Sequence, residues 1–198
     1  MAGTHQLWAL NLKTNRGFTF SGSGREGNLN NKFDLKQCEW AQPSGLSVGL
    51  ISSNHIELFV ADSESSAIRA INMKSLQSGR CVVGGDNNPK NLHAYGDLDG
   101  VGTDAKLQHP MSVHFIPEKN VILVTDTYNH KIKVVDPFRN EAFSWLGSGA
   151  AALTDQTTFH SCFNEPNGIA SLFDESTNDV KVYICDTNNH CIRRVYYD

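Results

Sequence analysis

The sequence of 198 residues predicts an all-β repeat fold, and three copies of one hairpin pattern carry the prediction. In each copy an apolar run ends in Asp, and an Ile that belongs to a second apolar run follows six positions later. The copies occupy positions 62–71, 126–135 and 186–195. Two apolar runs that flank a short polar turn are typical of a β-hairpin. Hairpins that recur at long spacing indicate a protein built from repeats.

The composition agrees with a globular β-protein. Hydrophobic residues make up 39% of the chain and charged residues 19%, with 16 glycines. The formal net charge of -4 offers no excess of positive charge for phosphate groups, which argues against nucleic acid as a partner. No apolar run approaches the roughly 18 residues that a membrane helix needs, and the first fifteen residues lack the pattern of a signal peptide.

The five cysteines predict a reducing, cytosolic setting. Their number is odd and none has CxxC spacing, which favours free thiols over a disulfide framework. Cys185 and Cys191 flank one hairpin, and we interpret them as core residues.

The first hairpin is recognised by alignment with the second full copy. Residues 5–11 match 130–136, so Met1 takes the place of Asp126 and the chain begins at a hairpin turn. A second short strand is expected at 18–24, where glycines close it.

Three fuller units follow, and each opens with a proline followed two positions later by a small residue. The prolines are Pro43, Pro110 and Pro166, and the small residues are Gly45, Ser112 and Gly168. Small side chains in a strand indicate close approach of another backbone, as on a crowded innermost strand.

The later strands of each unit complete the pattern. The second strands, at 58–61, 122–125 and 182–185, are apolar at nearly every position, which predicts central strands covered on both faces. Third strands begin at Ile68, Ile132 and Ile192, and fourth strands are expected at 81–85 and 143–149. The last unit ends after its third strand.

Four antiparallel strands with a crowded inner strand are typical of a β-propeller blade. The expected strand numbers of 2, 4, 4 and 3 give about three and a quarter blades, fewer than the roughly four needed to close a propeller. We therefore predict a single partial propeller domain over 1–198, with repeat units at approximately 1–24, 41–85, 108–149 and 164–198. The connections 85–109 and 149–166 are expected on one face, beside the Asp turns.

The turn residues 129–132 and 189–192, Asn-His-Lys-Ile and Asn-His-Cys-Ile, resemble the motif of the NHL-repeat family. The segment 99–110 resembles the lead-in to such a repeat. The resemblance implies an NHL-type β-propeller with six blades in a longer, monomeric parent. It also implies a thioredoxin-like domain before the propeller, a β-rich domain after it, a cytosolic location and no enzymatic activity. The first copy departs from the motif with Ser65-Ser66, so no function is assigned to the Asn-His pair itself.

The turns allow two interpretations. Asp126, Asp186, His130 and His190 are residue types that bind metals or form an acid–base pair. Alternatively, the Asp and Asn side chains hydrogen-bond the turn backbone. We favour the structural interpretation, because repeated turns lie about a blade apart and cannot share one ion.

No catalytic, cofactor-binding or metal-ligating residue is predicted. The acidic stretch 97–104 fails as a calcium loop, because Tyr95 and Lys106 stand where an EF-hand needs carboxylates. His109 and His114 lack zinc-site spacing, and Ser47 and Ala170 occupy the places equivalent to His114.

A basic residue follows the Ile of each hairpin, at Arg69, Lys133 and Arg193. This stripe could face RNA, or it could form ion pairs between blades. The balance of 17 basic and 21 acidic residues favours ion pairs.

The function expected from the sequence is a non-enzymatic platform for protein partners, whose identity the sequence does not name. An RNA-binding propeller is the alternative, and a metal-dependent lyase is a third. Aromatic or apolar residues on the two long connections are candidates for an interface. The alternative interpretation is that they pack beneath the loops. These residues are Leu92, His93, Tyr95, Phe159, His160 and Phe163.

Overall fold

The computed structural model describes residues 4–31, 33–76 and 79–197, so the predicted match of Met1 to Asp126 lies outside the described residues. Within the described part, fourteen strands form four antiparallel sheets. The strands are β1 (Leu7–Asn11), β2 (Arg16–Ser21), β3 (Pro43–Ser52), β4 (His55–Asp62), β5 (Ala67–Asn72), β6 (Gly79–Gly84), β7 (Gly100–Val101), β8 (Pro110–Ile116), β9 (Val121–Asp126), β10 (Lys131–Asp136), β11 (Glu141–Leu146), β12 (Pro166–Asp174), β13 (Asp179–Asp186) and β14 (Cys191–Tyr197). The all-β prediction with several antiparallel sheets is confirmed.

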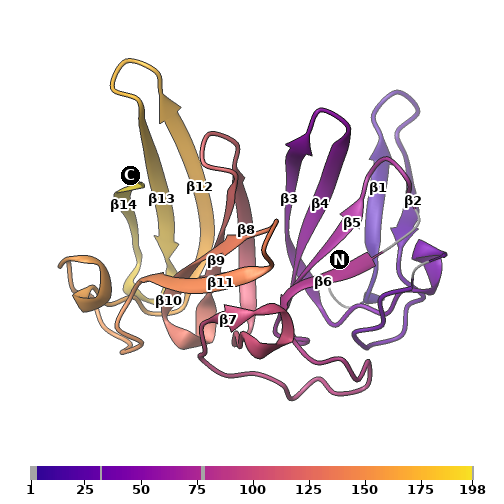
Figure 1. The fold of residues 1–198 in the computed structure, drawn as a ribbon, viewed down its shortest axis with the longest axis horizontal. Coiled ribbons are helices and arrows are strands. Elements are labelled where there is room, and N and C mark those ends of the chain that lie inside the picture. The colour runs from indigo at the N-terminus through magenta and orange to yellow at the C-terminus, as the bar shows by residue number, and fades with distance from the viewer. Residues whose placement is uncertain (1–3, 32, 77–78, 198) are drawn as a thin grey trace.

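The sheets follow one another along the chain (Figure 1). Their strand orders are β1-β2, β3-β4-β5-β6, β7-β11-β10-β9-β8 and β12-β13-β14. The tips of the hairpins β1–β2, β3–β4, β8–β9 and β12–β13 lie along one edge of the molecule, and the turns after β4, β9 and β13 lie along the other edge with the two long connections (Figure 1). We call this second edge the loop face.

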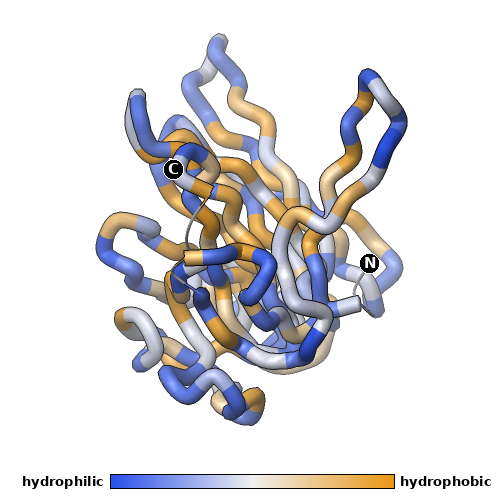
Figure 2. The backbone as a smooth tube through the Cα atoms, turned by 90° about the vertical axis from the view of Figure 1, so that its right-hand side faces the viewer, coloured by the Kyte–Doolittle hydropathy of each residue, from blue (hydrophilic) through white to orange (hydrophobic). Residues whose placement is uncertain are grey.

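Three hydrophobic clusters fill the spaces between successive sheets. The first joins Leu7 and Trp40 to Val60 and Ile71. The second lies between the β3–β6 sheet and the β8 sheet, and the third lies between the β8 sheet and the β12–β14 sheet. The central strands are mostly hydrophobic and the hairpin tips are mostly polar (Figure 2). Each sheet is therefore held chiefly by burial of apolar side chains against its neighbours.

The crowding predicted for the inner strands is confirmed at Gly45. A Cβ atom there would lie 2.7 Å from the carbonyl oxygen of Met111 on β8, closer than real Cβ atoms approach. At Gly168 the prediction is wrong, because the nearest atom is the Sγ of Cys185, 3.1 Å away on the neighbouring strand of the same sheet. Close backbone approach therefore explains the first glycine only.

Several strand predictions need correction. The third strands begin one residue earlier than expected, and β6 and β11 are shifted toward the N-terminus of the predicted fourth strands. The 85–109 connection is not only a loop, because β7 pairs with β11 and gives that sheet a fifth strand. A two-residue strand carries too little apolar pattern to be seen in a sequence.

The prediction that 182–185 is covered on both faces is wrong. Val182 and Ile184 on β13 are buried, but Tyr183 is half-buried and Cys185 is exposed. One face of the β12–β14 sheet therefore has no covering layer among the described residues. The interpretation of Cys185 as a core residue is wrong for the same reason. In the described part of the chain, no helix is long and apolar enough to cross a membrane.

Candidate functional site on the loop face

Three buried aspartates hold the loop face together. Asp62, Asp126 and Asp186 end β4, β9 and β13, and none is accessible to solvent. In each, Oδ1 accepts a backbone N–H at 2.7 Å, and the donors are Ala41, Gln108 and Asn164. Each donor stands two residues before the proline that opens the first strand. The sequence interpretation expected bonds to the turn backbone, whereas the carboxylates tie the incoming chain to the end of the second strand.

The second carboxylate oxygen fixes the turn itself. Ser65, Asn129 and Asn189 donate a side-chain hydrogen bond to the Oδ2 of their aspartate at 2.9, 2.8 and 2.9 Å. Asn129 also donates to the carbonyl of Gly96 at 2.7 Å, and Asn189 donates to that of Ala152 at 2.8 Å. The asparagines thus attach the 85–109 and 149–166 loops to the turns, whereas the second bond of Ser65 is to the carbonyl of Asp62 at 3.0 Å.

The residue after each aspartate links one sheet to the next. The hydroxyls of Ser63 and Thr127 donate to the carbonyls of Pro110 and Pro166, each at 2.8 Å. The Nδ1 of His130 accepts the N–H of Glu165 at 3.0 Å. Thr187 is exposed and has no such bond to a further sheet among the described residues. The Ser or Thr hydroxyl after the aspartate therefore links one sheet to the next. His130 accepts a further hydrogen bond at the second of these links.

The repeated basic residues lie inside the fold. Arg69 and Lys133 are buried and Arg193 is nearly so, and the interpretation of a stripe that faces RNA is wrong. Arg69 pairs with Asp62 at 2.6 Å, and Arg193 pairs with Asp186 at 3.1 Å. Their guanidinium groups also lie over aromatic rings, of Trp40 at 4.1 Å and Phe163 at 4.3 Å. The predicted ion pairs exist, but they form within a sheet and with its loop rather than between sheets.

Lys133 behaves differently from the two arginines. Its Nζ binds Asp97 at 2.9 Å and Asp99 at 2.8 Å, both on the 85–109 loop. Burial by itself lowers the pKa of Lys133, but its hydrogen bonds to Asp99 and Asp97 raise that pKa above its ordinary value. The sequence reasoning considered 97–104 only as a calcium loop and missed these acids as partners. Asp99 and Asp155 each stand eleven residues before the proline of their unit, and this shared spacing was the signal that could have revealed them.

As a result, none of the basic side chains that the structure describes is paired directly with Asp126. Burial raises the pKa of Asp126 from 3.8 to about 7, although hydrogen bonds from Asn129 and Gln108 oppose the rise. Burial also raises the pKa of Asp62, where Arg69 opposes it. Asp126 is thus a buried carboxyl that titrates near neutral pH.

The histidines considered for zinc lie in different environments. His109 stacks on Tyr128 at the loop face, with ring centroids 4.5 Å apart. His114 on β8 contacts Ser171 on β12, with Nε2 3.1 Å from the backbone N and 2.8 Å from Oγ. The contact links β8 to β12, since Nε2 accepts the backbone N–H of Ser171. Nowhere in the described ranges do three His, Cys, Asp or Glu side chains group as metal ligands.

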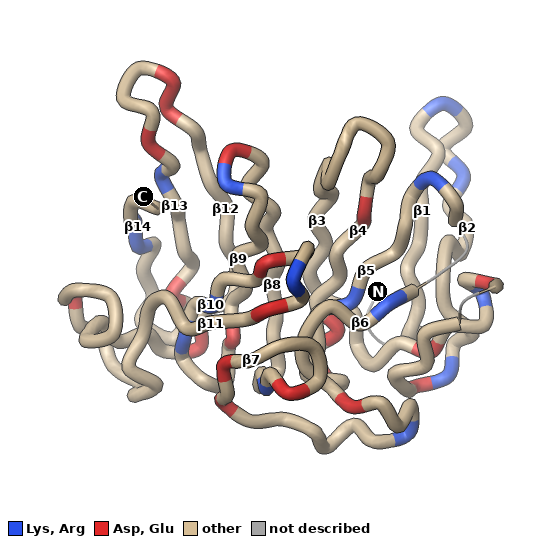
Figure 3. The backbone as a smooth tube through the Cα atoms, in the orientation of Figure 1, with Lys and Arg blue, Asp and Glu red and all other residues tan. Residues whose placement is uncertain are grey.

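The interface candidates separate into exposed and buried residues. Tyr95 is 56% exposed and Phe159 is 59% exposed, and His93 and His160 are also exposed. Leu92 is half-buried. Phe163 is buried beneath Arg193, so its prediction as an interface residue is wrong. Acidic and basic positions are interspersed along the chain, with several acids on the loop face (Figure 3).

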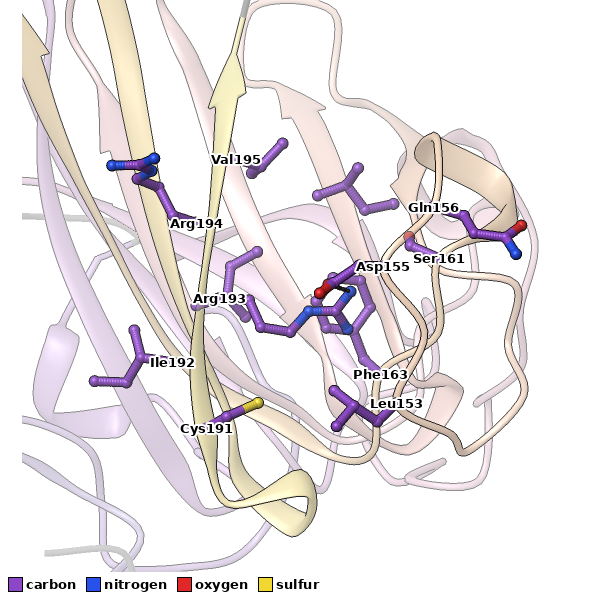
Figure 4. Close-up of a pocket in the computed structure, with 12 residues that line it drawn as sticks. Leu153, Asp155, Gln156, Ser161, Phe163, Cys191, Ile192, Arg193, Arg194 and Val195 are labelled. Atoms are coloured by element: carbon purple, nitrogen blue, oxygen red, sulfur yellow. Dashed lines mark hydrogen bonds and ion pairs between the residues drawn. The ribbon is translucent and has the colours of Figure 1, made fainter.

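A cavity of about 540 Å³ lies beside β14 (Figure 4). Arg193 points into it above Phe163 and toward Asp155, its partner at 2.6 Å, whereas Ile192 points to the other side of the strand (Figure 4). Among the described strands, β14 pairs with β13 alone, whereas the equivalent strands β5 and β10 each have two partners. Ile192 is 72% exposed, while Ile68 and Ile132 are fully buried. The cavity therefore follows a free strand edge.

Comparison with known proteins finds relatives that match nearly the whole chain. No family model matches the chain. It is 43% identical to NHL repeat-containing protein 2 of Bos taurus and of Homo sapiens, over 98% of the chain and 27% of each relative. It is also 38% identical to Protein SUPPRESSOR OF QUENCHING 1, chloroplastic, of Arabidopsis thaliana, over 98% of the chain and 18% of that protein. The chain thus spans about a quarter or less of the length of these curated relatives.

Solved structures agree at the level of fold. A protein of unknown function from Bacteroides thetaiotaomicron superposes with a TM-score of 0.70 at 16% identity, covering 98% of the chain and 42% of that structure. An auxiliary nutrient binding protein from the same organism gives 0.64 at 16% identity, covering 100% of the chain and 44% of that structure. At such low identity the likeness concerns the fold alone.

Proposed function

Because the chain is homologous to a part of NHL repeat-containing protein 2, we propose that it is an open arc of an NHL-type β-propeller that binds protein partners. The arc comprises about three and a quarter blades of a six-bladed, monomeric propeller in a cytosolic parent. Its role is that of a non-enzymatic platform. Four sheets stacked in sequence order, with β3, β8 and β12 adjacent on the inner side, support this arrangement.

The loop face carries the proposal, because it combines fixed backbone with exposed aromatic side chains. Asn129 and Asn189 hold the two long loops by hydrogen bonds to carbonyl groups. On these loops Tyr95 and Phe159 remain exposed. Rigid loops lose little conformational entropy on binding, and aromatic side chains often anchor protein interfaces. This combination suits recognition of another protein.

The alternative is RNA binding, which finds less support here. Single-stranded RNA is held by basic grooves with aromatic rings on which bases stack. Arg69, Lys133 and Arg193 are already paired with aspartates, and the chain carries a net charge of -4. A protein partner therefore remains the better candidate.

The test compares exposed aromatic residues on the two long loops with one on a short turn. Affinity capture uses the 198-residue chain as wild type, Tyr95→Ala, Phe159→Ala and Phe138→Ala. Phe138 is the control, because it is 55% exposed on the turn after β10 and belongs to neither long loop. We expect a captured protein to be lost or reduced at least fivefold by the first two variants and kept by the third. Capture that survives both loop variants would contradict the proposal.

A further inference from the structure

A second cavity, of about 470 Å³, opens on the loop face between the β3–β6 sheet and the β8 sheet. Its wall is formed by the turn after β4, the 85–109 loop and the turn after β9. We call it the His109–Tyr128 pocket after the two stacked residues that line it. Its volume falls within the usual range of small ligand sites.

One wall of the pocket is aromatic and held in place. The rings of His109 and Tyr128 stack at 4.5 Å with an angle of 8° between their planes. The backbone N–H of Tyr128 donates to the carbonyl of Gln108 at 3.1 Å, which fixes the turn against the incoming chain. Tyr128 is nevertheless about half exposed, and Tyr95 lines the same cavity. The pocket thus offers aromatic surface whose position does not depend on a ligand.

The charged groups of the pocket are predominantly acidic. Glu26 and Glu64 line it, and neither forms an ion pair with Lys or Arg among the described residues. The nearest partner of Glu64 is the Nδ1 of His109, at 3.6 Å. Lys90 also lines the cavity, but its ammonium binds Glu39 at 2.8 Å. Lys90 is therefore already paired with Glu39, whereas the two glutamates that line the cavity have no Lys or Arg partner among the described residues.

Carboxylates beside aromatic faces select a cation, and the planar guanidinium satisfies both groups at once. It stacks on an aromatic ring and donates two parallel N–H hydrogen bonds to one carboxylate, which a lysine ammonium cannot reproduce. We propose that the His109–Tyr128 pocket binds an arginine side chain of a protein partner, with the guanidinium between Tyr128 and Glu64. The inference rests on the proposed platform function and names the chemistry of its partner.

The direct test uses a small probe that carries the recognised group. N-acetyl-arginine methylamide is titrated into the chain labelled at tyrosine and histidine ring carbons, and NMR spectra report the rings of Tyr128 and His109. The matched probe is N-acetyl-citrulline methylamide, which has nearly the same shape without the charge. We expect saturable shifts with arginine at concentrations around 10 mM, because a lone side chain binds with a Kd of about 1 mM. The citrulline probe should give shifts at least fivefold smaller.

Variants locate the site. Glu64→Gln and Glu26→Gln keep the side-chain shape and should each weaken the arginine probe at least threefold. Glu118→Gln is the control, because Glu118 is an exposed acid on the turn after β8, at the opposite edge. Equal shifts with both probes, no saturable shift, or unchanged binding to Glu64→Gln would each overturn the proposal. An RNA oligonucleotide that moved the same signals more strongly than the arginine probe would overturn it as well.

Failure of the arginine site can be distinguished from failure of the proposed protein-binding function. If Tyr95→Ala abolishes capture of a partner but Glu64→Gln does not, the platform stands and the arginine site fails. If the arginine probe binds as expected but no loop variant affects capture, the pocket stands and the platform fails.

Discussion

At the scale of the residue, one short motif serves three mechanical purposes. The aspartate accepts from the incoming chain, the next hydroxyl reaches the following sheet, and the asparagine attaches a long loop. Each contact satisfies a backbone group that would otherwise be buried without a partner, which costs about 1–3 kcal/mol. These roles account for the recurrence of the motif without any chemistry at the histidine.

The hydrogen bond from the Thr127 hydroxyl to the carbonyl of Pro166 gives the first residue-scale prediction. Thr127→Val keeps the shape but leaves the carbonyl of Pro166 without its buried donor, and it should lower the free energy of unfolding by about 1–2 kcal/mol. Thr187→Val at the exposed equivalent should change it by less than about 0.5 kcal/mol. Urea denaturation of both variants measures the difference. Equal effects at the two sites would show that this hydrogen bond contributes nothing.

Asp126 gives a pH-dependent prediction. Its pKa is raised to about 7 in the folded state, so folding favours the protonated carboxyl. Stability from this group is complete below the unfolded pKa of 3.8 and is lost as the pH rises through about 7. In Asp126→Asn this decrease in stability with rising pH is absent, because asparagine does not ionise. Between about pH 5 and 7, the wild type should therefore lose up to about 1.4 kcal/mol per pH unit relative to the variant.

Urea titrations at four pH values between about 5 and 8 measure that difference. Asp136→Asn is the control, because hydrogen bonds from Arg139 and Phe138 outweigh burial and hold the pKa of Asp136 below its usual value. That carboxyl does not titrate in this range. Parallel pH profiles for the wild type and Asp126→Asn would refute the assignment.

At the scale of the element, the third strand of each unit supplies a buried cation to its own loop. Arg69 on β5 binds Asp62 and the carbonyls of Glu39 and Leu29. Lys133 on β10 instead binds two acids of the 85–109 loop. The basic residue at this strand position therefore binds its loop either through backbone carbonyls, as Arg69 does, or through loop aspartates, as Lys133 does. The sequence of the loop determines which of the two contacts forms.

Removal of one partner from such a buried pair should be costly. Arg69→Met leaves Asp62 buried without its cation and should lower the free energy of unfolding by about 3–5 kcal/mol. Arg194→Met, at an exposed position on β14, should change it by less than about 0.5 kcal/mol. Chemical denaturation measures both. A loss below about 1 kcal/mol for Arg69→Met would mean that the pair is not a major support of this sheet.

At the scale of the whole molecule, the β3–β6 sheet and the β12–β14 sheet leave apolar surface uncovered. On β3, three residues that alternate along the strand are exposed: Leu46, Val48 and Leu50. On the β12–β14 sheet, Leu172, Ile192 and Tyr196 are exposed. Exposed apolar patches of this kind are typical of surfaces that another layer covers.

These surfaces predict that the isolated chain associates with itself. Ile192→Lys places a charge on the exposed face of β14 without disturbing a buried contact, and it should weaken association about tenfold, or about 1.4 kcal/mol. Phe138→Lys, on an exposed turn, should leave association unchanged. Sedimentation velocity at several concentrations measures the effect. A chain that stays monomeric at high concentration would contradict the prediction.

The sequence by itself determined the strand repeat, the positions of the turns and the family resemblance. These features follow from local rules, since alternating apolar runs and turn residues act over a few positions. The tertiary structure decided where the polar side chains go. Burial of Arg69, the partners of Lys133, the exposure of Cys185 and the stacking of His109 on Tyr128 all depend on segments far apart in the chain. Whether a charge is exposed or buried is set by what packs over it, and one sequence position carries no record of that distant neighbour.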